Sequence, residues 1–241
     1  MRKLLLGDEA IAQAAIDAGL SGVYAYPGTP STEITEFIQL REEKRGDAEN
    51  KICCRWATNE KTAMEGALGM SYMGKRALVC MKHVGMNVAA DPFVNSAMTG
   101  VNGGLVVVAA DDPSMHSSQN EQDSRFYGKF ALMPIFEPSS QQEAYDMTRA
   151  AFELSEAVKL PVLMRVTTRM AHSRAVVNVT EEPRKQNEIC RPEDVRRWIL
   201  LPAFAKKRYV ELLAQQDDLM KASLESKYNF YRKGTKAERG V

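Results

Sequence analysis

The stretch that most constrains this chain covers residues 52–95, where two strand-like segments flank a segment with helical periodicity. Ile52–Thr58 is apolar and β-branched at its start, and small or apolar residues then recur at helical spacing: Ala63, Met64, Ala67, Leu68 and Met70. A second strand, Arg76–Met81, leads into the polar stretch Lys82–Asn87, which we expect to be a loop. In parallel sheets, ligands bind at the carboxyl edge. Glu60, at the predicted helix start, and this loop therefore mark a candidate site.

The same alternation of strands and helices fills residues 1–170. We expect further strands at Gly22–Tyr26, Gly104–Ala109, Leu132–Phe136 and Pro161–Thr167. We expect further helices at Asp8–Asp17 (with Asp8 as its cap), Glu33–Leu40 and Gln141–Val158. This order is typical of an α/β fold with a doubly wound parallel sheet and right-handed crossovers.

The last part of the chain has a different composition. Residues 1–175 are expected to form one domain, and residues 176–241 a linker and a helical extension toward a downstream domain that this chain lacks. Glu181–Arg197 is charged and contains two prolines, which is typical of a linker. Ala203–Tyr231 is mainly polar and basic and is predicted to be helical.

Composition excludes several classes of function. The net charge is +1, with 32 basic and 31 acidic residues, so bulk charge indicates neither nucleic acid nor a membrane surface as a partner. No apolar run approaches the roughly 20 residues of a membrane span. The four cysteines contain no CxxC pair and are interpreted as free thiols, which fits a reducing, cytoplasmic location.

The motifs of several common sites are also missing. The first strand–helix turn is PGTPS, not GxGxxG, and no GxxxxGK[ST] motif occurs. Ser117 and Ser118 lack the GxSxG setting of a serine hydrolase. The three histidines are far apart in sequence, so no metal site is predicted from this chain alone. From the residues alone, Glu60 is either a helix-start acid that interacts with the helix dipole or a site carboxylate.

Four stretches together resemble one family, the thiamine-diphosphate-dependent 2-oxoacid:ferredoxin oxidoreductases. They are YPGTPSTEI (26–34), NEK (59–61), MKHVGMNVAADP (81–92) and DDPSMHSSQNEQDSR (111–125). The likeness covers about residues 5–175 and weakens toward residue 241. Within the family, it is greatest to the large (alpha) subunits that use indolepyruvate. The resemblance implies that this region is the pyrimidine-binding domain, which is an α/β domain.

The resemblance also implies roles for individual residues. Glu60 matches the glutamate that bonds N1′ of the cofactor's aminopyrimidine ring and thereby assists proton removal from C2 of its thiazolium ring. Thr29 matches a threonine close to the substrate, although turn geometry alone could also explain it. The expected cofactor-binding residues are Pro27, Gly28, Thr29, Glu60, Met81, His83 and Asn87. The expected substrate contacts are His83, Asp111 and His116.

Two departures from the family pattern limit what this chain could do alone. Pyruvate-using members place an arginine near the end of the strand that corresponds to Gly104–Ala109, whereas Asp111 and Asp112 stand here. This difference favours larger aryl 2-oxoacids. The family's GDG motif and following asparagine, which bind Mg²⁺ and the diphosphate, are absent, as are the clustered cysteines of its 4Fe–4S clusters.

The resemblance therefore implies half of a shared active site. The expected partners are a diphosphate-binding domain of the same or another subunit, a smaller (beta) subunit, ferredoxin, coenzyme A and an aryl 2-oxoacid, in a homo- or hetero-oligomer. The expected reaction is oxidative decarboxylation to an acyl-CoA during amino-acid catabolism, with this chain inactive alone. Two alternatives stay open: a non-oxidative 2-oxoacid decarboxylase subunit, and an α/β interaction module that has lost the chemistry.

Overall fold

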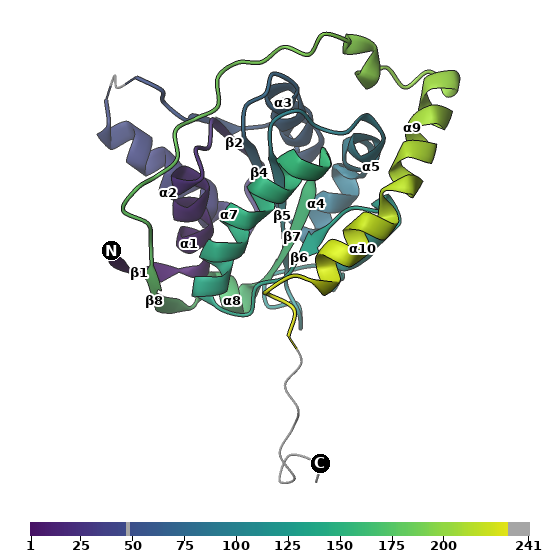
Figure 1. Ribbon diagram of the computed structural model, residues 1–241. Coiled ribbons are helices and arrows are strands. Elements are labelled where there is room, and N and C mark those ends of the chain that lie inside the picture. The colour runs from purple at the N-terminus through teal and green to yellow at the C-terminus, as the bar shows by residue number, and fades with distance from the viewer. Residues whose placement is uncertain (47–48, 231–241) are drawn as a thin grey trace.

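A parallel sheet of six strands forms the centre of the molecule (Figure 1). The computed structural model describes residues 1–46 and 49–230. In spatial order the strands are β3 (Cys53–Trp56), β2 (Gly22–Ala25), β4 (Ala77–Lys82), β5 (Leu105–Asp111), β7 (Val162–Thr167) and β6 (Ile135–Phe136). All neighbouring pairs are parallel, which confirms the predicted doubly wound α/β fold.

Helices bury both faces of this sheet. Side chains alternate between the faces of a strand, so Leu78 and Cys80 of β4 enter one apolar cluster while Val79 and Met81 enter the other. The first cluster is covered by α1 (Gly7–Asp17), α2 (Thr32–Lys44) and α7 (Gln141–Val158). The second is covered by α3 (Glu60–Tyr72), α4 (His83–Val88), α5 (Ala90–Thr99) and α6 (Arg125–Ala131). Because both faces are covered, β4 and β5 are nearly continuous apolar runs.

The polar stretch Lys82–Asn87 is not the expected loop, because residues 83–88 form α4. Met86 is fully buried in the second cluster, and the amide of Ala89 donates to the carbonyl of Gly85 at 2.9 Å. His83 is also fully buried. Tertiary burial of these side chains therefore stabilises a helix that local polarity did not predict.

Asp8 does not cap α1 as expected. The helix begins at Gly7, and the carboxylate of Glu9 accepts from the backbone amide of Leu6 at 2.8 Å. Asp8 lies inside the first turn and is fully buried. The helix predicted at Glu33–Leu40 is longer than expected, since α2 runs from Thr32 to Lys44.

A small antiparallel ribbon, which the sequence did not predict, lies beside the main sheet. Its strands are β1 (Arg2–Leu6) and β8 (Arg174–Asn178), and β8 follows the short helix α8 (Thr168–His172). β8 therefore spans residue 175, where we placed the domain boundary; that boundary stays a prediction.

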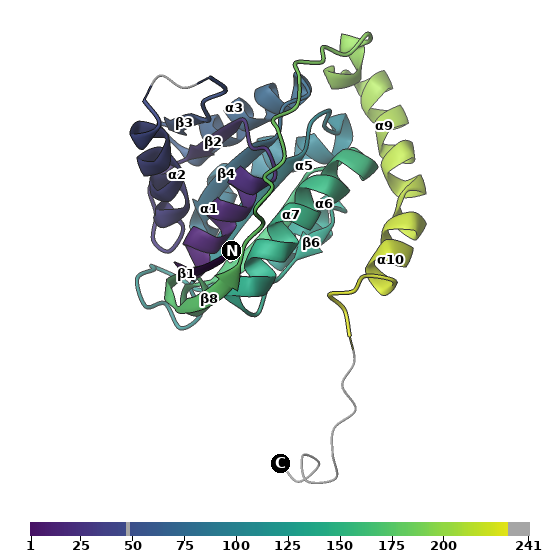
Figure 2. The same ribbon diagram turned by 60° about the vertical axis from the view of Figure 1, so that its left-hand side comes forward.

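Residues 179–194, which we call the strap, run from β8 to the 3₁₀ helix η1 (Val195–Trp198), as Figure 2 shows. The strap is held by hydrogen bonds to the backbone at the ends of two helices. The amide of Cys190 donates to the carbonyl of Met73, just after α3, at 2.9 Å, and the amide of Arg184 donates to the carbonyl of Asp17, the last residue of α1, at 2.8 Å. The predicted linker thus lies along the domain in an extended conformation.

The helical extension packs back onto the sheet layer. Trp198 stacks on Tyr72 with ring centroids 4.2 Å apart. The segment predicted to be helical contains two helices, α9 (Pro202–Ala214) and α10 (Gln216–Leu224), and Leu212 of α9 is buried in the second cluster. The predicted end of this segment, Tyr231, falls outside the described residues. No helix in the described part of the chain is long and apolar enough to cross a bilayer.

Candidate functional site

The candidate site lies where the strand order reverses. The chain passes from β2 to β3 on one side and then to β4 on the other side of β2, so β2 and β4 flank the reversal point. In doubly wound sheets, ligands bind outside the carboxyl ends of the strands at this point. The turn after β2 contains Pro27, Gly28 and Thr29, and α4 follows β4 directly.

The turn after β2 is held by two hydrogen bonds to the backbone of Gly28. The Gly28 amide donates to the hydroxyl oxygen of Thr32 at 3.0 Å, and the Gly28 carbonyl accepts from the Ser31 hydroxyl at 3.0 Å. A Cβ added at Gly28 would lie 3.2 Å from Cβ of Lys82, so the turn contacts the start of α4. Pro27 and Thr29 are exposed, which leaves both side chains accessible to a ligand.

Glu60 is the first residue of α3 and is buried, with 9% of its surface exposed. It does not cap the helix, because Oδ1 of Asn59 accepts from the amide of Thr62 at 2.9 Å. Instead its carboxyl group lies against Gly85: a Cβ added there would be 2.6 Å from Oε1 of Glu60. No described residue donates a hydrogen bond to this carboxylate. Glu60 is therefore a buried acid whose hydrogen-bonding capacity is unused.

The helix α4 connects the other predicted residues. Nε2 of His83 lies 3.0 Å from the carbonyl oxygen of Asn120, while its buried Nδ1 has no partner among the described residues. Nζ of Lys82 donates to the carbonyl of Ser117 at 2.8 Å. Asn87 is exposed and accepts from the hydroxyl of Tyr127, and Met81 is buried beneath the helix. The structure thus brings the turn, Glu60 and α4 together.

The loop between β5 and α6 is organised by Asp112. Its carboxylate accepts from the amide of Ser117 at 2.8 Å, from the hydroxyl of Ser118 at 2.6 Å and from that of Thr168 at 2.7 Å. Burial alone would raise the pKa of Asp112, but these hydrogen bonds outweigh it and hold the pKa well below its usual range. Asp112 is therefore ionised and fixes the loop whose carbonyls contact His83 and Lys82.

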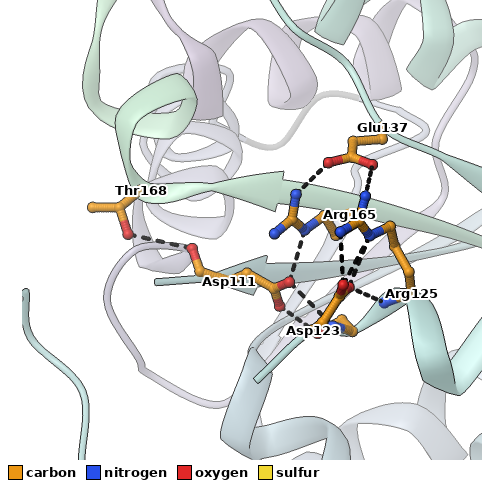
Figure 3. A network of polar contacts seen from close by, with 7 residues as sticks. Asp111, Asp123, Arg125, Glu137, Arg165 and Thr168 are labelled. Carbon is orange, nitrogen blue, oxygen red and sulfur yellow. Dashed lines mark hydrogen bonds and ion pairs between the residues drawn. The ribbon is translucent and has the colours of Figure 1, made fainter. Parts of the chain in front are cut away.

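Asp111 lies in a different network, shown in Figure 3. Its carboxylate accepts from Nε of Arg165 at 2.7 Å and from both the amide and the hydroxyl of Ser124. Arg165 also pairs with Glu137, which Arg125 contacts in turn at 3.2 Å. This network joins β5, β7, β6 and α6 at the carboxyl edge. The carboxylate of Asp111 is occupied within the chain, and its predicted substrate contact stays a prediction.

His116 lies in the loop between β5 and α6. It is exposed and lines an open groove of about 660 Å³ together with Pro113, Thr168 and His172. A larger groove of about 1290 Å³ lies between α6, β6 and α10, and none of the predicted site residues lines it. Volume alone therefore does not locate this site.

Sequence reasoning missed two features of the site. Gly85, which leaves room for the Glu60 side chain, was inside a segment expected to be a loop, so its contact with α3 had no local signal. Arg165 is far from Asp111 in sequence, and only the pairing of β5 with β7 brings them together. The arginine within the apolar run PVLMRVT was the one available signal.

Comparison with known families and relatives gives consistent results. Residues 13–229 match the family described as pyruvate flavodoxin/ferredoxin oxidoreductase, thiamine diphosphate-binding. The chain is 46% identical to the indolepyruvate oxidoreductase subunit IorA of Archaeoglobus fulgidus, over 95% of the chain and 37% of that protein. It is 42% identical to the same subunit of Thermococcus kodakarensis, over 100% of the chain and 37% of that protein. The chain thus spans little more than a third of these relatives.

More distant relatives share the fold. The 2-oxoglutarate synthase subunit KorA of Methanothermobacter thermautotrophicus is 28% identical over 73% of the chain and 47% of that protein. Among solved structures, the 2-oxoglutarate:ferredoxin oxidoreductase of Magnetococcus marinus, with 2-oxoglutarate, coenzyme A and succinyl-CoA bound, superposes with a TM-score of 0.68. It is 16% identical over 96% of this chain and 46% of that chain, so this likeness shows the fold alone.

Proposed function

The chain belongs to the thiamine diphosphate-binding family of the pyruvate flavodoxin/ferredoxin oxidoreductases, and from this premise we propose that it forms the pyrimidine-binding wall of an aryl 2-oxoacid:ferredoxin oxidoreductase. Indolepyruvate is the substrate we assign, because the relatives above 40% identity carry that name. Since the chain spans 37% of those relatives, the complete reaction belongs to an assembly with the remaining parts of the enzyme.

One observation carries this proposal: the buried, unused carboxylate of Glu60 beside Gly85. This carboxylate receives no hydrogen bond from the described residues, so it is free to accept one from a ligand. A protonated ring nitrogen is such a donor, and the missing side chain at Gly85 leaves room for the Glu60 side chain in this position. The residues present therefore fit the aminopyrimidine ring of thiamine diphosphate.

The proposed division of labour follows from these positions. When bound, thiamine diphosphate supplies the nucleophilic carbon that decarboxylation of a 2-oxoacid requires. Glu60 would accept a hydrogen bond from the protonated ring nitrogen N1′ and stabilise its charge. Thr29 and Pro27, exposed at the same edge, contact the substrate side, and α4 fixes the position of the ring through Gly85 and His83.

The remaining chemistry is assigned to other parts of the enzyme. Mg²⁺ and the diphosphate are held by a diphosphate-binding domain, and 4Fe–4S clusters carry electrons to ferredoxin. The 2-oxoacid loses CO₂, its acyl group is transferred to coenzyme A, and the released electrons reduce ferredoxin.

The test is reconstitution with the rest of the enzyme. The chain is co-produced with the diphosphate-binding and iron–sulfur parts, and ferredoxin reduction is measured with indolepyruvate, pyruvate and 2-oxoglutarate in the presence of coenzyme A. We expect indolepyruvate to give the highest kcat/KM. Release of CO₂ without ferredoxin reduction would instead favour the non-oxidative decarboxylase. An assembly that forms but does not react with any 2-oxoacid would favour the interaction module.

A further inference from the structure

The carboxyl group of Asp8 is the most unusual buried group outside the site described above. Asp8 is fully buried in the first turn of α1, and neither of its oxygens has a hydrogen-bond partner in the described part of the chain. Both oxygens of Asp8 are therefore free to bind a partner that the described residues do not supply.

Two more potential ligands converge on Asp8 from distant parts of the sequence. Glu33 lies in the first turn of α2, and His172 is the last residue of α8. Oε1 of Glu33 is 3.5 Å from Nε2 of His172, while Oε2 of Glu33 is buried and has no partner among the described residues. One ligand atom from each of the three side chains lies within 4.8 Å of the other two.

We propose that Asp8, Glu33 and His172 bind a divalent transition-metal cation. The set provides two carboxylates and one imidazole, and this mixture of oxygen and nitrogen ligands suits Zn²⁺ or a similar ion better than Mg²⁺ or Ca²⁺. One cation satisfies both unused carboxylates and the histidine at once. A proton shared between Asp8 and Glu33 leaves at least one oxygen of Asp8 without a partner.

A path for the cation is present. The His172 side chain is 34% exposed and lines the same open groove as His116 and Thr168, so the cluster communicates with solvent. Asp8 lies at the buried end of the cluster. The arrangement thus has a buried ligand, an intermediate one and an exposed one, as a site that loads from solvent requires.

The position of the cluster suggests what the cation does. Glu33 follows the turn that contains Pro27 and Thr29, and Asp8 and His172 belong to the elements next to the β1–β8 ribbon. A cation at this point fixes the start of α2, and with it the turn, against α1 and α8. The proposed role is structural, and it does not depend on the function proposed above.

The experiment is metal titration of the chelator-treated chain. Isothermal titration with Zn²⁺ is expected to show one site with a micromolar or lower Kd, and the melting temperature is expected to rise with bound metal. Co²⁺ serves as a spectroscopic probe: oxygen and nitrogen ligation gives weak visible bands without the intense near-ultraviolet charge transfer of thiolates. This absence separates the proposed site from binding to cysteines.

Variants localise the site. His172→Gln and Asp8→Asn are each expected to weaken Zn²⁺ binding by at least tenfold, whereas Glu36→Gln, at an exposed position of α2, is expected to leave the Kd unchanged. Because His172 is part-exposed, its substitution keeps the test valid even if Asp8→Asn alters folding. Absence of binding, or binding that survives His172→Gln, overturns the proposal and leaves a shared proton as the explanation of the Asp8–Glu33 pair.

Discussion

The carboxylate of Glu60 lies against the backbone of Gly85, so close that a Cβ at Gly85 would be 2.6 Å from Oε1 and 2.7 Å from Cγ of Glu60. This contact joins the first turn of α3 to α4, two helices that begin at the carboxyl ends of different strands. The carboxylate of Glu60 does not cap α3, because Asn59 does so. The proposed cofactor chemistry requires that the Glu60 carboxylate is not already used as a helix cap.

Glu60→Gln is the most direct test of the catalytic assignment. The amide keeps the shape but cannot stabilise a protonated ring nitrogen, and loss of such a contribution typically costs about 10²–10⁴ in rate. We expect kcat of the reconstituted enzyme to fall by that factor while the melting temperature changes little. Glu65→Gln, at an exposed position of the same helix, is the matched control. Near-normal turnover in Glu60→Gln would remove the assignment.

Gly85→Ala tests the contact from the other side. The added methyl group overlaps the Glu60 side chain, which must move away from its position. We expect kcat to fall at least tenfold, with the helical content of the chain retained. Gly69→Ala is the control, because no atom of the described residues lies within 4 Å of its added Cβ, and it is expected to stabilise α3 by roughly 0.5–1 kcal/mol. Equal activity of the two alanine variants would contradict the proposed role of Gly85.

Asp112→Ala tests what holds the loop between β5 and α6. The substitution removes three acceptor contacts, with Ser117, Ser118 and Thr168, so we expect faster hydrogen exchange at the Ser117 amide and proteolytic cleavage within residues 113–121. The global unfolding transition is expected to change much less than the local exchange. Protection of the loop equal to that of the parent chain would show that Lys82 and His83 alone suffice to hold it.

The ion pair of Glu156 with Arg76 predicts how stability depends on pH. Burial would raise the pKa of Glu156, but hydrogen bonds from Arg76 and Asn187 outweigh it and lower the pKa from 4.5 to about 2. The folded state therefore binds this proton less readily than the unfolded state. The stabilisation is fully present above about pH 4.5 and is lost as the pH falls toward 2; it amounts to at most about 3 kcal/mol.

Denaturant unfolding across this pH range measures the effect. Glu156→Gln is expected to lower the free energy of unfolding at pH 7 and to flatten its dependence on pH between about 4.5 and 2. Glu153→Gln, an exposed position on the same helix, is expected to preserve both the stability and its slope. A pH dependence of Glu156→Gln identical to that of the parent would assign the effect to other acids.

Most of the sheet was predictable because its signals are local. The helix at Gln141–Val158 has the predicted bounds, and the strand predicted at Pro161–Thr167 begins one residue later. The burial of a long amphipathic segment, or of a continuous apolar one, can be predicted from its own sequence. The strand predicted at Leu132–Phe136 is shorter, Ile135–Phe136, because Leu132 ends α6 with a positive φ of 59°.

The remaining differences depend on contacts between distant residues. α4 forms because Met86 and His83 are buried by other elements, and β1 forms because β8 pairs with it. For the site, the resemblance indicated Glu60, Thr29 and residues within Met81–Asn87, which the fold places near the point of strand reversal. It gave no indication of the Asp8–Glu33–His172 cluster, since these residues meet only after three separate elements have packed.

The β1–β8 ribbon has a consequence for how the chain is made. β1 is synthesised before every strand of the main sheet, yet its partner β8 follows only after all of them, and the amide of Val179 finally donates to the carbonyl of Met1 at 2.9 Å. Such non-local pairing slows folding, because the closure entropy is lost before the contact stabilises anything. During synthesis β1 is an unpaired edge strand, and α1 is not covered by α7 until that helix has been made. Chaperones that bind nascent chains would therefore meet the α7-facing side of α1 uncovered until α7, which ends at Val158, has emerged.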